Sequence, residues 1–195
     1  MTMNTASIAA PPSADGAPCA SDRPRCEVKE VDDDLCPAEH APLESQLVAF
    51  QVGLVPQAVA QARSAARQAF TAWNLDLDDP AVDTAIVVLS ELVTNAVKHA
   101  RLLCKVADVT LELVGCVLSV SVHDRHPYRP RALPAPHSDG RGGRGLALVR
   151  DLVAEAGGRT SVPIDADRHG KSMCVEIPIR SALLAAERPS VTRAA

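Results

Sequence analysis

The chain has 195 residues, of which 47% are hydrophobic, so it can form one ordinary domain with a sizeable core. Only two Phe, one Trp and one Tyr occur, which disfavours single-strand nucleic-acid sites that stack bases on aromatic rings. The formal net charge is −4, and residues 1–45 contain nine acidic residues but only three basic ones. This distribution argues against a protein that binds directly to the phosphate backbone of nucleic acids.

The two ends of the chain differ in composition from its middle. Residues 1–44 are rich in Pro, Ala, Ser and acids and are predicted to be a disordered tail, as are residues 183–195. The domain is therefore expected over residues 45–182. No apolar run of about 18 residues and no signal peptide are visible, so we expect a cytoplasmic protein that does not bind membranes. Cys104, Cys116 and Cys174 lie in or beside apolar segments, where reduced thiols are expected.

The hydrophobic pattern alternates between strand and helix periods along this domain. In chain order it predicts a strand over 46–52, helices over 56–73 and 79–99, strands over 106–113 and 116–123, a loop over 128–143, a helix over 145–156, and strands over 161–164 and 173–179. Pro56 and Pro80 suit first helical turns, and Gly157 with Gly158 suits a helix end. The order predicts an α/β two-layer sandwich with helices on one face of one sheet.

The second helix carries an apolar stripe and a polar row on nearly opposite sides. Helical spacing places the stripe at Ile86, Leu89, Val93, Ala96, Val97 and Ala100. Glu91, Asn95 and His99 follow one another at intervals of four residues and form the polar row. The spacing alone is equally compatible with ordinary solvated side chains on a helix surface.

Residues 87–96, and the run from Glu91 to Ala100, resemble the N-box of the Bergerat-fold ATPases and look closest to the anti-sigma-factor serine kinases. The resemblance implies a mixed, mainly antiparallel sheet that binds ATP and Mg²⁺. It implies that the side-chain oxygen of Asn95 ligates magnesium, that Glu91 is the general base, and that His99 belongs to the ATP site. The chemistry is consistent, because magnesium prefers hard oxygens and a nearby carboxylate can accept a hydroxyl proton.

Asp124 follows the apolar strand that begins at residue 116. An aspartate after a strand is by itself as readily explained as a turn former. In the resembled family an aspartate at this place accepts a hydrogen bond from the adenine amino group, so the resemblance assigns Asp124 that role. Residues 124–130 do not follow the family's Asp-x-Gly-x-Gly pattern and are instead rich in Pro and Arg. Ser172 corresponds to a threonine that the family places near adenine.

A glycine-rich segment over residues 140–145 formally fits G-x-G-x-x-G. A dinucleotide site would require a strand immediately before it, and residues 134–139 contain two Pro residues instead. The segment resembles the second glycine box of the same family, which implies a phosphate-binding helix N-terminus formed by Gly143, Arg144, Gly145 and Leu146. Gly170, Lys171 and Ser172 do not form a P-loop, because a strand rather than a helix follows them.

The resemblance implies a regulatory protein serine/threonine kinase that also binds and sequesters a sigma factor. Its phosphoryl acceptor would be a serine of a small anti-anti-sigma protein, and the strand before Pro56 could form a homodimer through the sheet edge. A non-catalytic module in which ATP gates protein binding is the alternative. A histidine-kinase catalytic domain is disfavoured, because the sequence shows no sensor and no phospho-acceptor helix pair.

Overall fold

One open sheet of five strands forms the base of the structure, a computed structural model that describes residues 45–126 and 144–179. The strands lie in the order β1-β2-β3-β5-β4, and each neighbouring pair is antiparallel. Their bounds are β1 Ser45–Gly53, β2 Val106–Val114, β3 Val117–Asp124, β4 Arg159–Ser161 and β5 Lys171–Pro178. The predicted tails and the loop over 128–143 lie outside the described residues.

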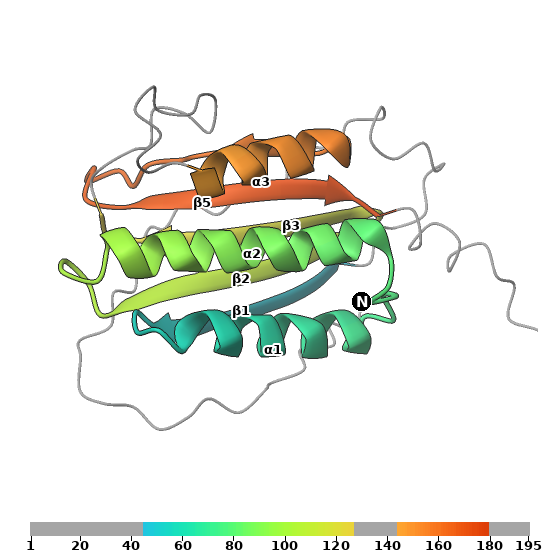
Figure 1. Cartoon of the computed structure of the whole chain (residues 1–195), viewed down its shortest axis with the longest axis horizontal. Helices are drawn as coiled ribbons and strands as arrows, with labels where there is room; N and C mark the ends of the chain where they lie inside the picture. Colours follow the sequence, from blue (N-terminus) through green and yellow to red (C-terminus); the bar gives the residue numbers. More distant parts are fainter. Residues whose placement is uncertain (1–44, 127–143, 180–195) are drawn as a thin grey trace, which may run out of the picture.

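Three helices cover one face of this sheet, so the predicted two-layer arrangement is confirmed (Figure 1). They are α1 Ala58–Ala72, α2 Pro80–His99 and α3 Arg144–Glu155. The long helix α2 lies between the other two and packs against β3 and β5. Its position makes it the element from which side chains can reach both α3 and the centre of the sheet.

The helix α2 begins where the sequence predicts. The Asp79 side chain accepts a hydrogen bond of 2.8 Å from the N–H of Ala81, and Pro80 occupies the first turn, where its missing N–H leaves no bond unmade. With 20 residues, α2 is long and apolar enough to cross a membrane by length and composition alone. Here it packs against α1, α3 and the sheet, as a core helix does.

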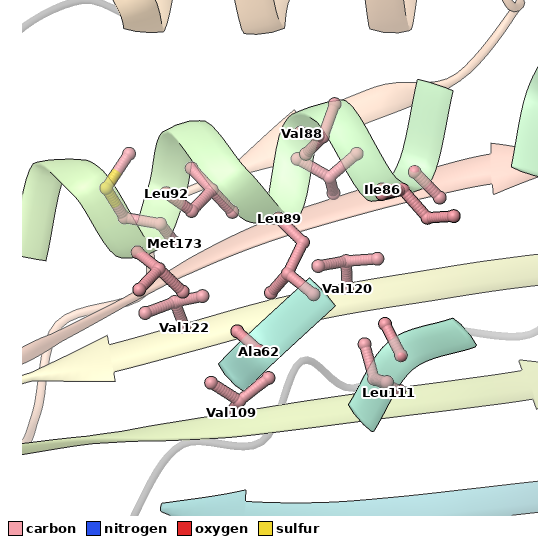
Figure 2. Close-up of a cluster of buried hydrophobic side chains, with 14 of the residues drawn as sticks. Ala62, Ile86, Val88, Leu89, Leu92, Val109, Leu111, Val120, Val122 and Met173 are labelled. Atoms are coloured by element: carbon pink, nitrogen blue, oxygen red, sulfur yellow. The ribbon is translucent and has the colours of Figure 1, made fainter. Parts of the chain in front are cut away.

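The core lies between the helices and the sheet. The predicted apolar stripe of α2 faces this layer, with Leu89 and Val93 fully buried. Figure 2 shows Leu89 beside Val120, and Leu92 near Met173. On β3 the even-numbered residues from Leu118 to Val122 point to the helices and belong to the core. On β5 the odd-numbered residues from Met173 to Ile177 do the same. This alternation determines which polar residues at the strand ends share the helix side.

Three predictions of detail differ from the structure. The helix predicted to open at Pro56 begins at Ala58. The strand predicted over 161–164 is instead β4, Arg159–Ser161, followed by an isolated bridge from Ile164 to Lys171. Pro163 explains the break, because it has no N–H for the ladder, although its carbonyl accepts from the Ser172 N–H at 3.0 Å. Reduced thiols were expected at three positions, but only Cys104 is free among the described residues; Cys116 and Cys174 are disulfide-bonded.

Candidate functional site

The polar row of α2 runs from Glu91, beside the first turn of α3, to His99 at the end of the helix. Glu91 and Asn95 are half-buried, and His99, at the end of the helix, is exposed. The neighbouring Val88 and Leu92 are fully buried, so this side of the helix is not a plain solvent face. The part of the row at Glu91 and Asn95 is therefore partly enclosed rather than fully solvated.

Glu91 reaches the first turn of α3. A Cβ atom placed on Gly145 would overlap the Glu91 Oε2 atom, so the carboxylate lies directly against the glycine backbone. Because Gly145 is the second residue of α3, the carboxylate is at the helix N-terminus, where backbone N–H groups favour negative charge. Glycine is required here for close approach, since any side chain would displace the carboxylate.

Asn95 lies one turn further along α2 and contacts β5. Its Nδ2 atom donates to the Met173 sulfur over 3.6 Å. The described residues supply no donor to the other end of the amide, so its Oδ1 atom is available to a ligand. Asn95 and Glu91 therefore present an amide oxygen and a carboxylate on the same side of the helix.

Asp124 ends β3 on the helix side of the sheet and is buried, at 2% exposure. Directly across the register lies Lys171, the first residue of β5, which is also buried. The Lys171 ammonium donates to Asp124 Oδ1 at 2.7 Å and to the His126 carbonyl at 3.3 Å. Sequence reasoning singled out Asp124 but missed Lys171 as its partner.

The remaining predicted site residues are distributed as follows. Leu146 is buried in the core at the start of α3. Ser172 is buried on β5 opposite His123, on the sheet face away from Asp124. Arg144 begins α3, but its side chain, like the whole of Gly143, lies outside the described part of the chain. The structure thus brings Glu91, Asn95 and Asp124 to the helix side and places Ser172 on the other face.

Two titratable groups border the end of the site near Asp124. Burial lowers the pKa of His126, and the charges of Lys171 and His99 lower it further, although Asp124 opposes them. Burial raises the pKa of the Cys104 thiol, with Asp124 adding to the rise and the Arg125 backbone opposing it. His126 is therefore favoured as a neutral ring and Cys104 as a neutral thiol at this end.

The family model of the histidine kinase-like ATPase domain matches residues 55–177, which is more than half of the chain. The chain belongs to the histidine kinase-like ATPase family. Its fold is thus that of an ATPase domain, and the resemblance seen in the sequence is confirmed at the level of the family.

Three of the solved structures that are similar to this ATPase domain come from bacteria. The RsbU and RsbW domains of Rv1364c from Mycobacterium tuberculosis are 19% identical, with a TM-score of 0.48, and the match covers 69% of this chain and 34% of that one. The histidine kinase domain of the Erythrobacter litoralis EL346 blue-light activated histidine kinase is 25% identical, with a TM-score of 0.40, and the match covers 56% of this chain and 50% of that one. The Acinetobacter baumannii histidine kinase AdeS is 17% identical, with a TM-score of 0.42, and the match covers 69% of each chain. The chain spans a third to a half of the first two structures. No curated protein matches the chain.

The residues of this ATPase domain fit a nucleotide with a divalent cation. The Asn95 Oδ1 atom, which receives no donor from the described residues, is a hard oxygen of the kind that Mg²⁺ prefers. The N-terminus of α3 offers backbone N–H groups of the kind that bind phosphate. Asp124 supplies a buried carboxylate that can accept from an amino group. The donor set therefore agrees with the cofactors that the family implies.

A second cluster lies on the opposite face of the ATPase domain's sheet. His123 Nε2 lies 3.0 Å from Asp165 Oδ2, and His123 Nδ1 lies 3.5 Å from Asp108 Oδ2. Burial alone would lower the pKa of His123, but its hydrogen bonds and charge interactions with both aspartates outweigh burial and raise it. Arg125 donates to Asp165 at 3.2 Å and to Asp167 at 2.9 Å. This cluster ties the residue after Asp124 to the turn before β5.

Proposed function

We propose that this ATPase domain is a protein serine/threonine kinase of the anti-sigma-factor type, which transfers the γ-phosphoryl group of ATP to a serine of a small anti-anti-sigma protein. The observation that carries the proposal is the arrangement of Glu91 and Asn95 one turn apart on α2, with the Glu91 carboxylate against the N-terminus of α3. The sequence around them resembles that branch of the family.

In the proposed reaction Glu91 accepts the proton of the acceptor hydroxyl, whose oxygen attacks the γ-phosphorus while the bond to ADP breaks. Magnesium, when bound, neutralises charge on the phosphate oxygens, and Asn95 Oδ1 would be its protein ligand. Asp124 would accept from the adenine amino group. Gly143, Arg144 and Gly145 would bind the phosphates at the start of α3, where a planar guanidinium can contact several oxygens. Leu146 and His99 would border the site, whereas Ser172 lies on the other face of the sheet and is left out of it.

The Glu91 carboxylate lies where the phosphates of a bound nucleotide would also lie. The carboxylate and a bound phosphate would both be near the N-terminus of α3, which favours negative charge.

The test is transfer of label from γ-labelled ATP, with magnesium, to candidate anti-anti-sigma proteins. We expect Glu91→Gln to lower the rate of transfer by about a hundredfold or more, while ATP binding is retained. The matched control is Glu155→Gln, which changes an exposed glutamate at the end of α3 and should leave transfer unchanged. ATP binding without transfer to any such protein would refute the kinase proposal and leave a module that only binds nucleotide.

A further inference from the structure

Asp124 and Lys171 form an ion pair that is buried on the helix side of the sheet. The two residues lie directly opposite each other at the ends of β3 and β5, and their side chains are only 3% and 4% exposed. Removing both charges from water is costly, and a buried pair repays this cost only when further hydrogen bonds satisfy its atoms. A pair in this place therefore requires an explanation beyond stability.

The two oxygen atoms of Asp124 are not equivalent. Oδ1 accepts from the Lys171 ammonium at 2.7 Å and from the His126 N–H at 2.8 Å. Oδ2 receives no donor from the described residues. One oxygen is thus fully engaged by the protein, and the other is left to accept a hydrogen bond from a ligand.

The charges around Asp124 make Lys171 its principal counter-ion. His126 follows β3, and its low pKa favours the neutral ring. Cys104, between α2 and β2, is a thiol whose pKa is raised. The Arg125 guanidinium is directed to Asp165 and Asp167 on the other face of the sheet. Among the described residues, Lys171 is the cation that contacts the Asp124 carboxylate.

We propose that Lys171 is a positioning residue that sets purine specificity, by holding Asp124 as a carboxylate with only Oδ2 turned to the base. A carboxylate in this state can only accept hydrogen bonds. It therefore selects a base with an amino group at position 6 and rejects one with an oxygen there. This inference rests on the proposed binding of adenine at Asp124.

The consequence of losing Lys171 follows from burial. A buried carboxylate without a counter-charge is accommodated most readily by taking up a proton. The protonated group both donates and accepts, so it can pair with a 6-oxo base as well as with a 6-amino base. The loss of the lysine charge should therefore reduce discrimination between bases more than it reduces overall nucleotide affinity.

The experiment compares the affinities of ATP and inosine triphosphate, which carry an amino group and an oxygen at position 6. Affinities are measured by calorimetry with the full chain and magnesium. Because a hydrogen bond to a charged group contributes about 1.5–3 kcal/mol, we expect Lys171→Met to lower the ATP preference by about tenfold or more. Lys171→Arg keeps the charge and should restore the preference. Lys98→Met, at an exposed lysine of α2, is the matched control.

A second variant of Lys171 keeps the test decisive if Lys171→Met does not fold. Lys171→Gln removes the charge but retains a donor for Oδ1, and it should lose the preference as Lys171→Met does. One outcome would refute the role of Lys171 but leave the adenine site standing. In that outcome the wild type prefers ATP, Asp124→Ala abolishes the preference, and the uncharged Lys171 variants keep it. If the wild type binds both nucleotides equally, or neither, the proposed adenine site fails and the inference fails with it.

Discussion

The carboxylate of Glu91 lies so close to Gly145 that a methyl group on residue 145 would overlap its Oε2 atom. The contact joins the middle of α2 to the first turn of α3, two elements separated by two strands and a long segment of chain. It makes the position of the proposed base depend on a residue without a side chain. The N-terminus of α3 can thus control where Glu91 points.

The substitution Gly145→Ala tests this dependence. The atom that the new methyl group meets is the far end of a flexible side chain, so Glu91 can move aside at little cost in stability. We expect the free energy of unfolding to change by less than about 1 kcal/mol, while phosphoryl transfer falls about ten- to a hundredfold because the base is misplaced. In a Glu91→Ala background the same substitution should cause no further loss. Equal losses in both backgrounds would show that Gly145 acts independently of Glu91.

Asn95→Ala removes the proposed magnesium ligand. We expect the enhancement of ATP affinity by magnesium, measured by calorimetry with and without the ion, to fall at least about tenfold, because the amide oxygen is a protein-derived ligand for a cation that otherwise keeps its waters. Lys98→Ala changes an exposed side chain on the next turn and is the control. An unchanged magnesium dependence in the Asn95 variant would exclude this residue as a ligand.

Local patterns in the sequence predicted much of the helix layer. The polar row of α2 follows from the helical period, and its start follows from Asp79 and Pro80. That Glu91 and Asn95 are half-buried against α3 and β5 could not be predicted from the period, because the same spacing describes a solvated face. The neighbours that distinguish the two cases come from distant parts of the chain.

The ion pair of Asp124 with Lys171 illustrates what local patterns leave out. The residues are 47 positions apart, and they meet because β3 and β5 pair in one particular register. A slip by one residue would send either side chain to the opposite face of the sheet. The same register explains why Ser172, next to Lys171, lies away from Asp124. Pro163 is a local case: hydrophobicity alone predicts a strand up to residue 164, but β4 ends at Ser161, before the proline.

The buried His123 should make stability depend on pH. The pKa of His123 in the folded protein is raised above its ordinary value of 6.5 by Asp108 and Asp165, which outweigh burial. Its protonation therefore stabilises the fold fully below pH 6.5, and this contribution is lost as the pH rises through the folded-state pKa. Each unit of elevation corresponds to about 1.4 kcal/mol.

His123→Gln retains hydrogen-bonding capacity but does not titrate, so it tests this contribution. We expect the urea midpoint of the wild type to decline between pH 6 and pH 8.5 by more than that of the variant. The difference between the two slopes isolates the histidine from other titrating groups. Parallel pH profiles for the two proteins would show that His123 does not gain a proton on folding.

Gly158 lies where the end of α3 packs onto the sheet. A Cβ atom at this position would overlap the Glu176 carbonyl oxygen and lie 3.0 Å from Val153 Cγ1. Neither the β5 backbone nor a fully packed valine can move freely, in contrast to the Glu91 carboxylate beside Gly145. We expect Gly158→Ala to lower the free energy of unfolding by about 1–3 kcal/mol in urea. Gly53→Ala, whose added atom would meet only Val55 Cγ2 at 4.0 Å, should change it by less than about 1 kcal/mol. If both alanine variants are equally stable, α3 does not approach β5 as closely as the structure has it.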